Sequence, residues 1–95
     1  MSDFTNGLTP AEAERLAILA EECGEVVQTA MKILRHGKDY HPISNSGLLA
    51  RELGHVQWIV NLMISNGDFE EGVLLQSERL KPVCSRTYLH HQEDL

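Results

Sequence analysis

Two short segments carry side chains suited to metal chemistry. Glu21, Glu22 and Glu25 fall within five consecutive positions, and Glu52 and His55 lie three residues apart in a second segment. Carboxylate oxygens and imidazole nitrogens are common protein ligands of divalent cations. We therefore expect the two segments to face each other and to hold one or two cations.

The acidic residues of the first segment lie on an apolar helical face. Residues three or four positions apart share one side of a helix. Glu22 and Glu25 therefore share a face with Ile18, Thr29 and Ile33, whereas Glu21 lies further round the helix. The second segment repeats this pattern, with members Leu48, Glu52, His55, Ile59 and Leu62.

Carboxylates on an apolar face have two physical explanations. An unpaired carboxylate that leaves water costs several kcal/mol, and neighbouring carboxylates repel one another. Either the glutamates stay on a solvated face, or a cation neutralises them. Lysine and arginine are scarce on these faces. The pattern on two consecutive helices favours a divalent cation, and the solvated acidic face is the alternative.

Local signals predict a long first helix from about Pro10 to His36. Thr9 fits the N-cap and Glu12 fits the third helical position, which together form a capping box, and Gly37 fits the stop. Apolar residues recur at spacings of three and four and predict a core-facing stripe. Its members are Leu16, Ala20, Cys23, Val27, Ala30 and Leu34.

One residue of the Ser44-Asn45-Ser46 cluster is predicted to be the N-cap of the second helix, with Ser46 favoured, and the helix is predicted to end at Asn66-Gly67. Between these ends lies an apolar stripe that is expected to face the core. Its members are Leu49, Leu53, Val56, Val60 and Met63.

Two short helices complete the prediction. Asp68, with Glu71 three residues later, predicts a second capping box and a third helix. Pro82 predicts a break near Lys81, followed by a fourth helix over residues 83–90. The expected fold is thus an all-α bundle of two long and two short helices.

Length and composition limit the class of protein. The 95 residues predict one domain, residues 1–95, with mobile ends at 1–8 and 92–95, and a thin core that favours oligomers. A net charge of −6 argues against nucleic acid or an anionic membrane as partner. Two cysteines, no signal peptide and no membrane-spanning run predict a cytoplasmic protein.

At these residues the chain resembles the MazG-like, all-α nucleotide pyrophosphohydrolases. The signature of that family is Glu-Glu-x-x-Glu, a spacer of one to two dozen residues, and Glu-x-x-Asp. Here it reads Glu21-Glu22-x-x-Glu25 and Glu52-x-x-His55, with Asn61 as matching context, and the resemblance spans about residues 9–90. It implies a magnesium-dependent hydrolase that converts nucleoside triphosphates to monophosphates and pyrophosphate, and that assembles as a dimer or a dimer of dimers.

The chain departs from the signature at one position. His55 stands where the family has aspartate. Imidazole suits zinc, manganese or nickel better than magnesium, and a neutral histidine removes one negative charge from the site. The resemblance implies Mg²⁺ as the cofactor, and His55 makes Mn²⁺ a more favourable alternative.

Each candidate residue has an expected role. Glu22, Glu25, Glu52 and His55 hold the metal, Glu21 polarises water or helps to hold a second metal, and Glu22 is shared with catalysis. The candidates for binding phosphate are Lys32, Arg35, Lys81 and Arg86. Asn61 is the candidate for a hydrogen bond to the sugar or the base. The alternative for each cation is a solvated surface position. The alternatives for the whole protein are a nucleotide binder without turnover and a helical interaction module.

Overall fold

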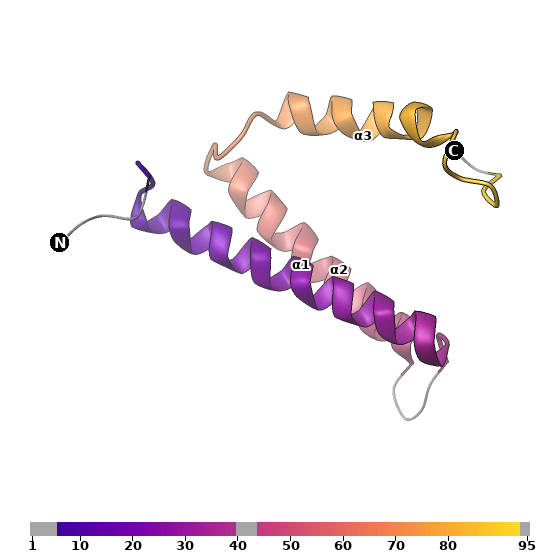
Figure 1. Cartoon of the computed structure of the whole chain (residues 1–95). Coiled ribbons are helices and arrows are strands. Elements are labelled where there is room, and N and C mark those ends of the chain that lie inside the picture. Colours follow the sequence, from indigo (N-terminus) through magenta and orange to yellow (C-terminus); the bar gives the residue numbers. More distant parts are fainter. Residues whose placement is uncertain (1–5, 40–43, 94–95) are drawn as a thin grey trace.

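The described residues form an antiparallel helical hairpin and a third helix. The structure is a computed structural model that describes residues 6–39 and 44–93. These residues fold into α1 (Pro10–His36), α2 (Asn45–Ser65) and α3 (Glu71–Ser85). Figure 1 shows α1 and α2 side by side, with α3 diverging from them. The all-α prediction is confirmed. The ends predicted to be mobile lie partly outside the described residues.

The boundaries of α1 follow from local chemistry. The Thr9 hydroxyl accepts a hydrogen bond from the Glu12 amide at 3.1 Å, and the Glu12 carboxylate accepts one from the Thr9 amide at 2.8 Å. This is the predicted capping box. At the other end Gly37 has φ 85°, a conformation that glycine adopts readily. Both predicted boundaries of α1 are confirmed.

The start of α2 differs from the prediction. Ser44 rather than Ser46 is the N-cap, and its hydroxyl accepts a hydrogen bond from the Gly47 amide at 3.3 Å. Asn45 is buried and donates to the Gly37 carbonyl at 2.9 Å, which ties the start of α2 to the end of α1. This contact holds Asn45 as the first residue of α2, so that Ser44, the residue before it, is the N-cap. Part of the connecting loop, residues 40–43, lies outside the described residues.

Pro82 does not interrupt α3, so the predicted fourth helix is wrong. The helix continues through Pro82 to Ser85, and residues 86–88 form a turn in which the Tyr88 amide donates to the Ser85 carbonyl at 2.9 Å. Pro82 removes one helical hydrogen bond close to the C-terminus. Because most of α3 is exposed, water can satisfy the carbonyl that loses its partner.

The face that α1 turns toward α2 is the acidic one. Ile59 is fully buried and Met63 nearly so, and both lie on α2. The predicted apolar stripe of α1 instead faces outward, because Val27 is 62% exposed and Leu34 is 78% exposed. Cys23, predicted to be buried, is exposed. The predicted core stripe is therefore wrong for this hairpin.

The apolar stripe predicted for α2 is partly exposed and partly buried. Leu53 is 48% exposed, whereas Met63 is buried.

Within the described part of the chain, no helix is both long enough and apolar enough to cross a membrane.

An ion pair connects α1 to the segment before α3. Arg15 Nε donates to Asp68 Oδ2 at 2.6 Å, and Arg15 Nη2 donates to Asp68 Oδ1 at 2.8 Å. Both side chains are largely buried. Asp68 was predicted to cap α3, but Glu70 occupies that position without a side-chain capping bond. The bidentate pair with Arg15 engages the Asp68 carboxylate instead.

The pair predicts a specific dependence of stability on pH. Arg15 holds the pKa of Asp68 below its ordinary value of 3.8 through a side-chain hydrogen bond. A depressed carboxyl pKa stabilises the folded state fully above the unfolded value of 3.8, and this contribution is lost as the pH falls below 3.8 and through the lower pKa of the folded state. We expect Asp68→Asn to lower the thermal unfolding temperature at neutral pH, and to lower it less at about pH 2.

Exposed Asp39 provides the control, because Asp39→Asn should leave the unfolding temperature unchanged at both pH values. An equal loss of stability in Asp68→Asn at both pH values would contradict a contribution from the ion pair.

Candidate metal centre

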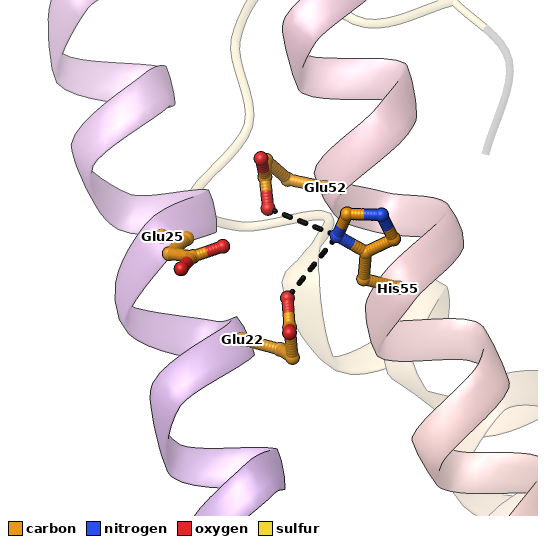
Figure 2. Close-up of side chains that lie close together, drawn as sticks. All are labelled: Glu22, Glu25, Glu52 and His55. Carbon is orange, nitrogen blue, oxygen red and sulfur yellow. Dashed lines mark ion pairs between the residues drawn. The ribbon is translucent and has the colours of Figure 1, made fainter.

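Four side chains from α1 and α2 converge between the two helices. Glu22 and Glu25 lie one turn apart on α1, and Glu52 and His55 lie one turn apart on α2. Figure 2 shows all four side chains pointing into the space between the helices. One ligand atom from each lies within 4.8 Å of those of the other three. The predicted metal ligands are therefore brought together by the fold.

The closest contacts in this group are made by His55. Its Nδ1 lies 3.3 Å from Glu22 Oε2 and 3.3 Å from Glu52 Oε2. Both oxygens are buried, and neither has a hydrogen-bond partner. A neutral imidazole can supply at most one N–H at Nδ1, and therefore cannot satisfy both oxygens. The group thus contains buried negative charge that lacks adequate partners.

The carboxylates of Glu25 and Glu52 affect each other directly. The pKa of Glu25 is raised above 4.5, because its protonated carboxyl can hydrogen-bond to Glu52, and the charge of Glu52 and burial act in the same direction. The pKa of Glu52 is lowered, first by that hydrogen bond from Glu25 and further by Arg51 and His55, against the effect of burial. A proton or a cation is therefore favoured between these two side chains.

The remaining predicted residues lie outside the group of four. Glu21 is exposed on α1, one position round the helix from Glu22. Lys32 and Arg35 are exposed further along α1, and Asn61 is exposed on α2 where that helix borders a groove next to α3. Lys81 lies in α3 and Arg86 directly after it, and both are exposed.

A small cavity next to the group combines Lys32, a candidate for phosphate binding, with residues that the sequence did not single out for binding. It has a volume of about 220 Å³ and is lined in part by Gln28, Thr29, Lys32 and Arg51 together with Glu25 and Glu52. Thr29 is buried and donates its hydroxyl to the Glu25 carbonyl at 2.9 Å. The spacing of Glu25, Thr29 and Lys32 on one helical face could have revealed the α1 side of the cavity. No comparable spacing identifies Arg51.

Comparisons with protein families, with curated proteins and with solved structures found no match for this chain. The resemblance to MazG-like enzymes therefore stays a prediction from the two motifs.

The repulsion within the group predicts opposite effects on stability and on metal binding. We expect Glu25→Gln to raise the thermal unfolding temperature of the metal-free protein, because an amide at this position can donate to Glu52 without adding charge. The same substitution should abolish the rise in unfolding temperature that Mn²⁺ produces in the wild type.

Glu14→Gln, at an exposed position on the same helix, is the matched control and should change neither quantity. A Mn²⁺-dependent rise that persists unchanged in Glu25→Gln would exclude Glu25 as a ligand.

Proposed function

We propose that this protein is a metal-dependent nucleoside triphosphate pyrophosphohydrolase. In this reaction the oxygen of water bonds to the α-phosphorus, and the bond from that phosphorus to the α–β bridging oxygen breaks. Pyrophosphate leaves with the bonding electrons, the attacking water releases a proton to solvent, and the products are a nucleoside monophosphate and pyrophosphate. A cytoplasmic location, where nucleoside triphosphates are abundant, forms part of this proposal.

The observation that supports the proposal best is the pair of unsatisfied buried oxygens. Glu22 Oε2 and Glu52 Oε2 are buried, lack hydrogen bonds and approach the same imidazole nitrogen. An acidic surface without a ligand would leave these oxygens in water, where solvation removes the cost. Their burial beside Glu25 favours a cation as the third partner.

The residues have distinct proposed roles. Glu22, Glu25, Glu52 and His55 hold one or two divalent cations, and each cation, when bound, neutralises phosphate oxygens and lowers the pKa of the attacking water. Glu21, at the exposed edge of the group, polarises that water or helps to hold a second cation. Arg35, Asn61, Lys81 and Arg86 remain candidates for contacts with the substrate.

His55 affects the choice of metal. Three carboxylates supply hard oxygen ligands suited to Mg²⁺, and the imidazole nitrogen shifts the set toward transition ions such as Mn²⁺. We propose Mg²⁺ as a cofactor that supports turnover and Mn²⁺ as the ion that binds more tightly. The aspartate of the MazG-like signature would favour Mg²⁺ instead.

A second candidate function follows from the same residue. With His55 in place of aspartate, the site would bind a nucleotide together with a metal but would not hydrolyse it. Thermal stabilisation by a nucleotide without release of pyrophosphate would identify such a binder. Absence of stabilisation by any metal would favour a helical interaction module.

Enzyme assays provide the direct test of the proposed reaction. We expect pyrophosphate to be released from nucleoside triphosphates in the presence of Mg²⁺ or Mn²⁺. Glu22→Gln should reduce the rate by at least about 100-fold, the order lost when a charge-stabilising group is removed from an active site. His55→Asp should raise Mg²⁺-dependent activity by about tenfold, the scale on which metal-site substitutions act.

Activity that survives in Glu22→Gln would contradict the assignment. Unchanged Mg²⁺ dependence in His55→Asp would remove His55 from the metal ligands.

We also propose that copies of this chain assemble into a homodimer or a homotetramer. Apolar side chains on the outer faces of α1 and α2 are exposed, among them Val27, Leu34 and Trp58 at 62%, 78% and 55%. A groove of about 590 Å³ between α2 and α3 is lined largely by apolar residues such as Leu53 and Leu74. Exposed apolar surface on this scale is typical of an interface between subunits.

Replacement of outward-facing residues tests this assembly. We expect the double substitution Val27→Glu and Leu34→Glu to lower the molar mass measured by light scattering to that of a single chain. Burial of two added charges in an apolar interface opposes association. Ala11→Glu, at an exposed position in the first turn of α1, should leave the mass unchanged. A single-chain mass for the wild type would contradict the proposal.

A further inference from the structure

The small cavity beside the metal-binding group contains two cationic side chains that face the same space. Lys32 reaches it from α1 and Arg51 reaches it from α2. Glu25 and Glu52 form the wall that the cavity shares with the proposed metal centre. A molecule in the cavity would therefore lie against two of the metal ligands, Glu25 and Glu52, and beside two cationic residues.

Both cations retain donors for a ligand. Lys32 makes no ion pair or hydrogen bond within the described part of the chain, although Glu25 lines the same cavity. Arg51 Nη2 lies 3.3 Å from Glu52 Oε1, and its side chain is 63% exposed. A guanidinium has five N–H groups, so one contact with Glu52 leaves most of them available.

The charges in the cavity favour an anion once a metal is bound. Glu25 and Glu52 contribute two negative charges, and Lys32 and Arg51 contribute two positive charges. A divalent cation held by Glu22, Glu25 and Glu52 offsets two of their three negative charges. With Lys32 and Arg51 the site then has a net positive charge, so the cavity attracts an anion.

The size of the cavity limits the kind of anion. A volume of about 220 Å³ is below the roughly 300–1,000 Å³ that encloses a drug-sized ligand. A chain of phosphates fits this volume, and the sugar and the base of a nucleotide would extend beyond it.

We propose that this cavity binds the pyrophosphate portion of the substrate, with Lys32 and Arg51 as its ligands. The two side chains hold the β- and γ-phosphates before cleavage and stabilise the charge of the leaving pyrophosphate afterwards. Arg51 is thus a specificity residue for polyphosphate, and the cavity imposes no selection on the base. This assignment rests on the proposed pyrophosphohydrolase function.

Binding of inorganic pyrophosphate tests the assignment without turnover. The wild type, Arg51→Gln and Lys32→Gln are each saturated with Mn²⁺ and titrated with pyrophosphate in a calorimeter. We expect each substitution to raise the dissociation constant by about tenfold, the effect of losing one charged contact. Arg79→Gln, at an exposed position on α3, serves as the charge-matched control and should bind as the wild type does.

Binding of Mn²⁺ alone, followed by electron paramagnetic resonance, separates the two proposals. Lys32→Gln should bind Mn²⁺ as the wild type does, because Lys32 is not in the group of four and makes no ion pair or hydrogen bond with it. Arg51→Gln should also bind Mn²⁺, with an affinity changed only by the loss of the contact with Glu52. Failure of the wild type to bind Mn²⁺ would overturn the metal-dependent function itself. Normal Mn²⁺ binding with wild-type affinity for pyrophosphate in both variants would overturn only the phosphate pocket. Equal weakening in Arg79→Gln would also overturn it.

Discussion

The contact between α1 and α2 is constrained by carboxylates that the hairpin encloses. Glu22, Glu25 and Glu52 face one another where a bundle would ordinarily place aliphatic side chains. Burial of Ile59 and Met63 on α2 brings the helices together, and the acids oppose that approach by desolvation and repulsion. The hairpin therefore encloses a group of acids in which a proton or a cation is favoured.

This constraint explains why so much apolar surface remains outside the hairpin. The inner face of α1 contains Glu22, Glu25 and Thr29, and apolar residues such as Val27 and Leu34 lie on the outer face. A hairpin with a polar centre buries little apolar area, and α3 adds little because it does not pack closely on α1 or α2. Association of several chains would supply the missing burial and leave the acidic centre intact.

The properties that the sequence predicted correctly are those set within a few residues. Thr9 and Glu12 form their capping box through neighbouring amides, and Gly37 ends α1 through its own φ angle. Helical spacing also puts Glu22 with Glu25, and Glu52 with His55, on one face each. These features need no knowledge of distant contacts, whereas the meeting of the two pairs depends on the packing of α1 on α2.

The errors arose where distant contacts decide between local alternatives. Asp68 has the spacing of a cap for α3, but Arg15, 53 positions earlier, engages it. Two adjacent faces of α1 are both apolar enough to be a core, and only the position of α2 selects the acidic one. Arg51 could not be identified because its role depends on a cavity formed by both helices.

The most direct test is a crystal structure of the protein soaked with Mn²⁺, in which anomalous scattering locates the ion. We expect a peak between α1 and α2, roughly 2.0–2.3 Å from oxygens of Glu22, Glu25 and Glu52 and from a nitrogen of His55. A crystal in which Mn²⁺ is absent from this position, and the three carboxylates turn into solvent, would contradict it.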